Sequence, residues 1–420
     1  MKKRYGLYSI LSLGSALMVL SGCGGGGGSP SVPSTPTVGV NIEGADWVAF
    51  QDGASGSWQV LSSSNQSVAV NAPDGRYTVA YVCGGEKPTV NVVHAVRSEL
   101  PQVAANCATP PSGNTVSVNV NLQGMSGSSG ALVGIGSASS TITGTGTLTV
   151  APGTYDVIGV RLVSGLPNRL WLERNRLFNA SGNYTINFDQ ADSSTVRVVD
   201  VSAGTLSLNG LDSSSLEQAT VQILLQNSII GVGASLPGDT SLTVRYPVPP
   251  SGVIQASDRV RVVVSTTTER GGLAILSALP GTLPITLLAS YSSPTFSVNS
   301  TGPVVFTVNN FAYTGASPVR GYQVSVRGED QDARWNLFYS TGWLGSQTQI
   351  TTPSFTGLSS WNGTAWEIQR GLPVTVSVRA YVSGSASAEN LQNYLAGNLQ
   401  ALPVGYEVRY VTANSDLITP

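Results

Sequence analysis

Short stretches in which apolar residues alternate with small or polar ones recur along this chain. The segments 38–42, 116–120 and 206–208 follow this pattern. A period of two sends successive side chains to opposite faces of a strand, which predicts β-strands buried on one face. Helical periodicity is scarce, and the best candidate is the short segment 388–399. The sequence therefore predicts an all-β fold with little helix.

These three segments are expected to be the first strands of successive modules. They begin about 78 and then about 90 residues apart along the chain. This spacing matches the size of an immunoglobulin-like or related sandwich. Between the alternating stretches, turn-forming Gly, Asn and Ser are abundant. We therefore expect tandem β-sandwich modules.

A second element recurs at a similar interval. Pro73–Tyr77 (PDGRY) and Pro152–Tyr155 (PGTY) each continue into a Tyr-x-Val strand. Proline fixes φ and glycine supplies a positive φ, so each segment predicts a hairpin turn. The pattern resembles a hairpin of prealbumin-like and carboxypeptidase-regulatory-like sandwiches, and of modules in bacterial lipoproteins. That resemblance implies a sandwich fold for each module.

These signals divide the body of the chain into four expected modules. The first contains two cysteines, the segment 110–113 (PPSG) follows it as a linker, and the last contains four of the seven tryptophans. The expected β-sandwich modules are 37–110, 114–200, 201–308 and 309–420, and the short helix lies in the last of them.

The N-terminus has the three parts of an export signal. Basic residues at 2–4 precede an uncharged, mostly apolar stretch at 6–20. A membrane span needs about 20 residues, so this stretch is too short for one. The sequence Leu20-Ser21-Gly22-Cys23 then resembles the lipobox of bacterial lipoproteins. The resemblance implies a signal peptide at 1–22, cleavage before Cys23, and lipid attachment to its thiol. An ordinary signal peptide that contains a cysteine is the alternative.

The segment 23–36 follows as a tether. Gly24–Gly28 predicts a flexible chain, and the Pro/Ser-rich run behind it predicts a stiffer, extended one. Several acyl chains on one residue give stable membrane anchoring. We therefore expect a membrane anchor through the N-terminal lipid and a location in the cell envelope, at the outer membrane or the cell surface.

Charge and cysteine content limit the partners. Charged residues make up 10% of the chain and the net charge is −2, which gives no reason to expect nucleic-acid binding. Cys83 and Cys107 form an even pair outside the cytoplasm and predict a disulfide. A metal or catalytic pair is the alternative, but CxxC spacing is absent and His94 is the only histidine. A structural or surface role for His94 is expected, and no cofactor.

The tryptophans of the last module are candidates for ligand binding. Trp343 and Trp361 follow or precede Gly, Ser and Asn in turn-like settings, so we expect them to be exposed. Aromatic faces of this kind stack on sugar rings. Trp335 and Trp366 lie among alternating residues and are expected in the core. The alternative is that all four are core residues.

An arginine cluster is the second candidate. Regular alternation would place Arg174 and Arg176 on one strand face, opposite Trp171 and Glu173. Such a face could bind an anionic glycan or a carboxylate of a partner protein. A solubilising surface is the alternative.

The acidic turn 329–332 is the third candidate. Asp330 and Asp332 could contribute to a Ca²⁺ site, although a full site needs six or more oxygens. A solvated turn is the alternative.

No G-x-S-x-G elbow or phosphate-binding loop occurs in the chain. We therefore predict a non-enzymatic, lipid-anchored envelope protein with a structural, adhesive or protein-binding role. The alternative is a carbohydrate-binding surface lipoprotein, and the third hypothesis is an envelope hydrolase. An envelope glycan or a surface protein is the expected partner.

Overall fold

The computed structural model describes residues 36–108, 113–210, 216–225, 228–234, 243–267, 269–385 and 387–420. The expected signal peptide, the lipobox-like sequence with Cys23, and nearly all of the expected tether lie outside these ranges. The described chain consists of strands with three short helices and one 3₁₀ turn. This confirms the all-β fold class and the arrangement in tandem sandwiches.

The first sandwich consists of a three-stranded sheet packed on a four-stranded one. In the smaller sheet β1 pairs antiparallel with β4 and parallel with β7, and the larger has the order β3-β2-β5-β6. The strands are β1 (Thr37–Glu43), β2 (Ala45–Asp52), β3 (Trp58–Val60), β4 (Asn65–Ala69), β5 (Arg76–Cys83), β6 (Thr89–Val96) and β7 (Gln102–Asn106).

The second sandwich repeats this topology and adds one strand. Its small sheet has the order β11-β8-β14, and its larger sheet has the order β10-β9-β12-β13-β15. The strands are β8 (Val116–Gln123), β9 (Gly130–Ile135), β10 (Ala138–Ile142), β11 (Thr145–Val150), β12 (Gly153–Val163), β13 (Leu166–Phe178), β14 (Gly182–Asn187) and β15 (Val196–Asp200).

The third sandwich has the same seven-strand plan. Its sheets have the orders β19-β16-β22 and β18-β17-β20-β21. The strands are β16 (Ser202–Asn209), β17 (Leu216–Leu225), β18 (Ser228–Ala234), β19 (Thr243–Val248), β20 (Arg259–Thr266), β21 (Arg270–Leu276) and β22 (Thr282–Thr286).

The fourth sandwich packs β23-β24-β27 against β26-β25-β28-β29. Ser387 caps α3 through Asn390 N, which confirms the expected short helix, although α3 ends at Leu395. The elements are β23 (Thr295–Val298), β24 (Phe306–Asn309), β25 (Val319–Arg327), β26 (Arg334–Ser340), α1 (Thr341–Leu344), β27 (Gln349–Thr351), α2 (Gly363–Trp366), β28 (Pro373–Val382), α3 (Ala388–Leu395), the 3₁₀ turn η1 (Leu399–Ala401) and β29 (Glu407–Ile418).

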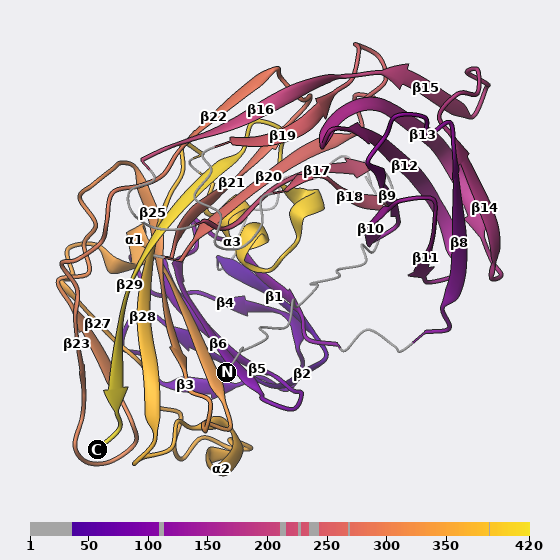
Figure 1. Cartoon of the computed structure of the whole chain (residues 1–420). Helices are drawn as coiled ribbons and strands as arrows, with labels where there is room; N and C mark the ends of the chain where they lie inside the picture. The colour runs from indigo at the N-terminus through magenta and orange to yellow at the C-terminus, as the bar shows by residue number, and fades with distance from the viewer. Residues whose placement is uncertain are drawn as a thin grey trace, which may run out of the picture.

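Three of the four sandwiches share one sheet. β29 pairs antiparallel with β21 of the third sandwich, and β26 pairs parallel with β6 of the first. The result is a continuous twelve-stranded sheet with the fourth sandwich in its middle. Four strand edges that isolated sandwiches would expose, those of β21, β29, β26 and β6, are thereby paired. In Figure 1 this sheet curves from β17 past β28 to β3, and β1 and α3 lie inside the curve.

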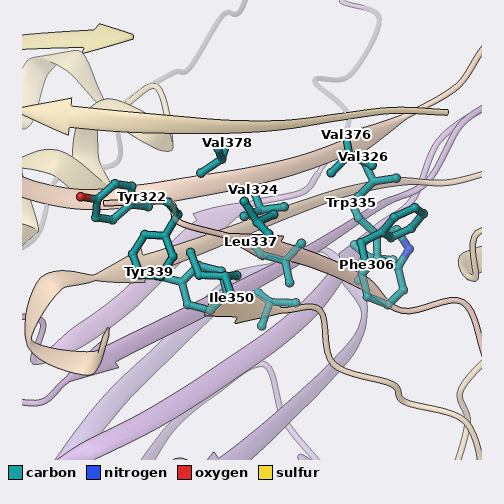
Figure 2. Packing of buried hydrophobic residues seen from close by; sticks show 14 of the residues in the cluster. Phe306, Tyr322, Val324, Val326, Trp335, Leu337, Tyr339, Ile350, Val376 and Val378 are labelled. Atoms are coloured by element: carbon teal, nitrogen blue, oxygen red, sulfur yellow. The ribbon is translucent and has the colours of Figure 1, made fainter. Parts of the chain in front are cut away.

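The two faces of this sheet are covered by different parts of the chain. Valines of β25 and β28 pack against Phe306 of β24 and Ile350 of β27, as Figure 2 shows. On the opposite face of the twelve-stranded sheet, β1 and β7 pack on the strands of the first sandwich. The helix α3 and the turn η1 pack on one end of the strands of the fourth. Between these two packed regions, the same face of β25 and β28 in the fourth sandwich is not covered by another described element.

The recurring Pro-Gly turns do not form hairpins, so that expectation is wrong. β4 pairs with β1, whereas β5, directly after the turn, pairs with β2 and β6. The turn between β11 and β12 likewise joins two different sheets. The chain needs a sharp corner there to cross the core, and Gly75 provides it with φ of 69°.

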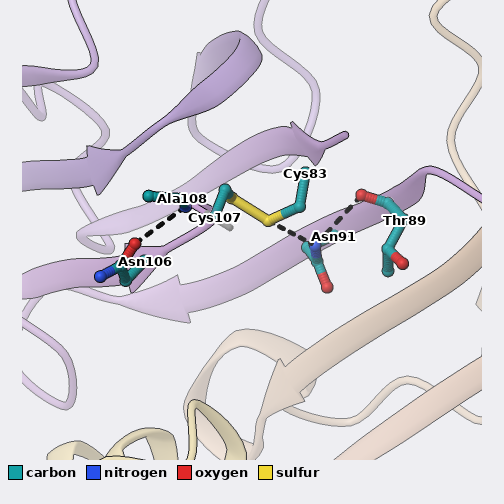
Figure 3. The surroundings of a disulfide bond; sticks show 6 residues. All are labelled: Cys83, Thr89, Asn91, Asn106, Cys107 and Ala108. Atoms are coloured by element: carbon teal, nitrogen blue, oxygen red, sulfur yellow. Dashed lines mark hydrogen bonds between the residues drawn. A yellow bond between two sulfur atoms is a disulfide. The ribbon is translucent and has the colours of Figure 1, made fainter. Parts of the chain in front are cut away.

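The expected disulfide between Cys83 and Cys107 is present. It links the end of β5 to the residue after β7, and so joins the two sheets of the first sandwich (Figure 3). On a chain-entropy model, a loop of 24 residues of separation corresponds to about 3 kcal/mol of stability. In the described part of the chain, no helix is long and apolar enough to cross a membrane.

Candidate ligand-binding surface

The open face of the fourth sandwich is built by two nearly identical pentapeptides. Residues 323–327 read QVSVR on β25, and residues 375–379 read TVSVR on β28. Because the side-chain period of a strand is two, all four valines enter the core and the polar residues share the other face. The strands are antiparallel, so Gln323 lies opposite Arg379, Ser325 opposite Ser377, and Arg327 opposite Thr375.

These residues line a shallow hollow of about 280 Å³. The neighbouring strand β29 contributes Tyr410, and the β20–β21 hairpin of the third sandwich contributes three residues. The complete lining is Ser265, Thr266, Glu269, Gln323, Ser325, Arg327, Thr375, Ser377, Arg379 and Tyr410. It contains no aliphatic side chain, so its chemistry is that of hydroxyls, an amide and charges.

Arg379 is held firmly on the floor of the hollow. Its Nε donates to Thr412 Oγ1 at 2.8 Å, and its guanidinium lies 4.4 Å from the centre of the Tyr410 ring. A terminal nitrogen lies 3.5 Å from Glu269 Oε2. Glu269 also accepts a hydrogen bond from Asn414. Arg379 is therefore neutralised and oriented by the protein itself.

Arg327 differs from Arg379 in having no such partners. Its side chain is exposed and makes no hydrogen bond or ion pair with any residue in the described ranges. Desolvation by the surrounding protein lowers the pKa of Arg327, and the like charges of Arg379 and Arg334 lower it further. The guanidinium remains charged at neutral pH, since its ordinary pKa is above 12. It is therefore a cation without a direct ion-pair partner at one end of the hollow, and Glu269 is the carboxylate whose charge acts on it.

A glycine allows the hollow to extend across two sandwiches. Gly271 of β21 lies opposite Tyr410 of β29, and a Cβ at Gly271 would meet the Tyr410 hydroxyl at 2.6 Å and Val264 O at 2.0 Å. Any larger residue would push the tyrosine away from the strand junction. Gly271 thus permits the close approach that joins the third and fourth sandwiches beneath the hollow.

The expectation that Trp343 is exposed is wrong. Its side chain is 8% exposed and packs on His94 and Tyr339. Ser340 caps the one-turn helix α1 by accepting a hydrogen bond from Trp343 N, and Gly345 ends it. The sequence STGWLG therefore forms a helical turn that directs the indole into the core, rather than an exposed loop.

Trp361 is half-buried and also packs within an aromatic cluster. Its ring centre lies 5.0 Å from that of Trp47 and 4.9 Å from that of Phe355. Trp335 is buried, which confirms the expectation for it, and half-buried Trp366 joins the same cluster. Trp343 and Trp361 therefore offer no coplanar, open pair of faces for a sugar ring.

The shared face expected for Arg174 and Arg176 is also wrong. Asn175 has φ of 55°, and the pairing of β12 with β13 shifts register at this point, which marks a β-bulge. Arg176 consequently lies 3.7 Å from Glu173 and over the Tyr184 ring. The bulge breaks the alternation from which a common face was inferred.

Arg174 joins the second sandwich to the third. Its two terminal nitrogens lie 2.9 Å from Asp156 Oδ2 and 2.6 Å from Asp258 Oδ2. Both carboxylates are nearly inaccessible. Nearby, Gly134 of β9 leaves room for Ile230 of β18, since a Cβ there would come within 2.4 Å of that side chain. Both ion pairs of Arg174 are therefore made within this junction, and its guanidinium is not available to a ligand.

The acidic turn gathers no cluster of metal-binding side chains in the described part of the chain. No group of three or more His, Cys, Asp or Glu lies close enough there to hold a metal ion. Asp332 accepts a hydrogen bond from Gln369, and neither it nor Asp330 belongs to such a group.

His94 is a buried structural residue, as expected. It lies parallel to the Tyr339 ring at 4.3 Å, and its Nδ1 lies 2.8 Å from Thr78 Oγ1 in a hydrogen bond. Burial lowers the pKa of His94 from 6.5 to about 3. The imidazole is therefore neutral at physiological pH and out of reach of a substrate.

The hollow could have been found from the repeated pentapeptide, but its position depends on pairing that the sequence does not reveal. The motif x-Val-Ser-Val-Arg occurs at both 323–327 and 375–379. Its polar positions could equally have faced solvent on a flat outer surface. The curvature of the twelve-stranded sheet and the covers on either side turn that face into a hollow.

No protein-family model matches this chain, and no curated protein sequence does. Among solved structures, the FN1–FN3 domains of chicken CNTN1 cover 91% of this chain and 97% of their own, with 9% identity and a TM-score of 0.18. A tetra-tandem repeat from the extending region of a large adhesion protein covers 92% of each chain, with 9% identity and a TM-score of 0.14. Similarity at this level carries no information about function.

Proposed function

We propose that this chain is a lipid-anchored protein of the bacterial cell envelope, with a rigid body that binds a partner without catalysis. The observation that carries the proposal is the polar hollow on a continuous sheet shared by three sandwiches. A surface of this kind is preorganised, because its side chains lie on paired strands rather than loops. The lipobox-like sequence would provide the membrane anchor, and the tether would hold the folded body away from the membrane.

A binding role fits the hollow better than catalysis does. Glu269 is the one carboxylate among the residues that line it, and Arg379 and Asn414 already engage this group. Glycoside hydrolysis in its usual form requires two carboxylates across the scissile bond. The pair Asp156 and Asp258 is engaged by Arg174 at a sandwich junction. These arrangements support a non-enzymatic protein.

Carbohydrate binding is the second candidate function, and the hollow favours it. Trp343 and Trp361, the tryptophans that the sequence predicts for this role, pack against other aromatic rings. The hollow instead offers hydroxyl and amide groups that can hydrogen-bond to sugar hydroxyls.

Replacing Cys23 by alanine tests the anchor. We expect the variant to move from the membrane fraction to the soluble envelope fraction, because the thiol that would carry the lipid is removed. Fractionation of cells followed by immunoblotting measures this. The matched control is Ser21→Ala, which keeps a small residue in the lipobox and should stay with the membrane. Full membrane retention of the Cys23→Ala variant would contradict the proposal.

A further inference from the structure

The charges of the hollow leave one positive charge unneutralised. Arg379 and Glu269 form an ion pair, while Arg327 has no partner among the described residues. A ligand that fits must therefore bring one negative group to the Arg327 end. A guanidinium presents a planar fork of donors, which matches the two oxygens of a carboxylate.

The rest of the hollow selects against an apolar ligand. Ser325 and Ser377 lie between the two arginines, Thr375 lies opposite Arg327, and Gln323 lies opposite Arg379. The one aromatic ring in the lining, that of Tyr410, is covered by the Arg379 guanidinium. No aliphatic pocket exists in this lining for a peptide side chain. Closely spaced hydroxyls and amides instead suit a ligand that is itself rich in hydroxyls.

The length of the hollow favours more than one sugar unit. Arg327 and Arg379 stand at opposite ends of the paired motifs, four positions apart along the strand direction. At about 3.3 Å per residue, this is about 13 Å of strand. That distance exceeds the width of a single sugar ring.

We infer that the hollow binds a segment of an acidic polysaccharide, with a uronate carboxylate held by Arg327 and neighbouring sugar hydroxyls held by Ser325, Ser377 and Thr375 of the two motifs. This inference rests on the proposed binding function and names its ligand class.

The test measures binding to the detergent-solubilised full chain by isothermal titration calorimetry. The probes are hexagalacturonate, its methyl ester, neutral galactohexaose and poly-L-glutamate. We expect hexagalacturonate to bind at least ten-fold more tightly than the two uncharged sugars and poly-L-glutamate. The affinity should fall on addition of salt, because the contact is partly exposed.

The Arg327→Gln variant should bind hexagalacturonate at least ten-fold more weakly, since it loses a charged, two-pronged contact. Arg327→Lys keeps the charge but loses the fork, and should give an intermediate affinity. The matched control is Arg97→Gln, an exposed arginine outside the hollow, which should bind like the wild type. Equal melting temperatures show that the variants are folded.

Two results would overturn the inference. One is hexagalacturonate binding that Arg327→Gln leaves unchanged, and the other is poly-L-glutamate binding as tightly as the sugar. If the wild type binds isolated cell-envelope fragments but hexagalacturonate neither binds nor competes, the ligand class is wrong and the binding function stands. Failure to bind any envelope material removes the proposed function as well.

Discussion

Replacing Arg174 by methionine is expected to lower the free energy of unfolding by about 3–5 kcal/mol, because it leaves two buried carboxylates facing each other without a cation. Asp156 and Asp258 are 3% and 1% exposed, and each forms a close ion pair with Arg174. Methionine preserves most of the side-chain length, so the loss reports on charge rather than on packing. Urea unfolding followed by tryptophan fluorescence measures the effect.

Arg176→Met is the matched control for this prediction. Its side chain is about half exposed and lies 3.7 Å from Glu173, so the expected loss is below about 1 kcal/mol. Adding Asp156→Asn and Asp258→Asn to Arg174→Met should restore part of the lost stability, since the repulsion between the carboxylates is then removed. An Arg174→Met protein as stable as the Arg176→Met control would show that the junction does not depend on this network.

The second large effect is expected at Trp47. This residue belongs to β2 of the first sandwich, but its ring packs on Phe355 and Trp361 of the fourth, and its Nε1 donates to Ser359 O at 3.2 Å. Trp47→Ala should cost about 3–5 kcal/mol, because it opens a cavity between two sandwiches that are also joined through β6 and β26.

Trp47→Phe separates packing from the hydrogen bond. It keeps a ring in the cluster and loses the indole N–H, so the expected loss is smaller than that for alanine. Chemical unfolding of both variants gives the comparison. If Trp47→Ala costs less than about 1 kcal/mol, the first and fourth sandwiches do not share a core around this ring.

Local patterns predicted the elements better than their assembly. Alternation in the segments 38–42, 116–120 and 206–208 identified strands β1, β8 and β16 correctly. Ser387 and the apolar positions after it identified α3. These signals are local because a strand or a helix buries one face at a fixed period. The pairing of β26 with β6 joins segments far apart in the chain, and no local pattern encodes it.

The incorrect site predictions have specific physical causes. A bulge at Asn175 changed which side of the strand Arg176 occupies, and such irregularities interrupt any argument from periodicity. Trp343 lies in a sequence typical of a turn, but the cap at Ser340 made that turn helical and directed the ring inward. The hollow was missed because its residues look like ordinary solvent-facing strand positions until neighbouring sandwiches enclose them.

The most direct test of the account is whether the hollow is the surface through which the protein binds the cell envelope. Ser377 lies in the centre of the hollow, and Ser377→Tyr fills it with a side chain that strands tolerate well. Ser297→Tyr is the matched control, because Ser297 is an exposed strand residue on β23, outside the hollow. Retention of the purified proteins on immobilised envelope fragments is measured. We predict at least ten-fold weaker retention for Ser377→Tyr and unchanged retention for Ser297→Tyr, whereas equal retention of all three proteins would contradict the account.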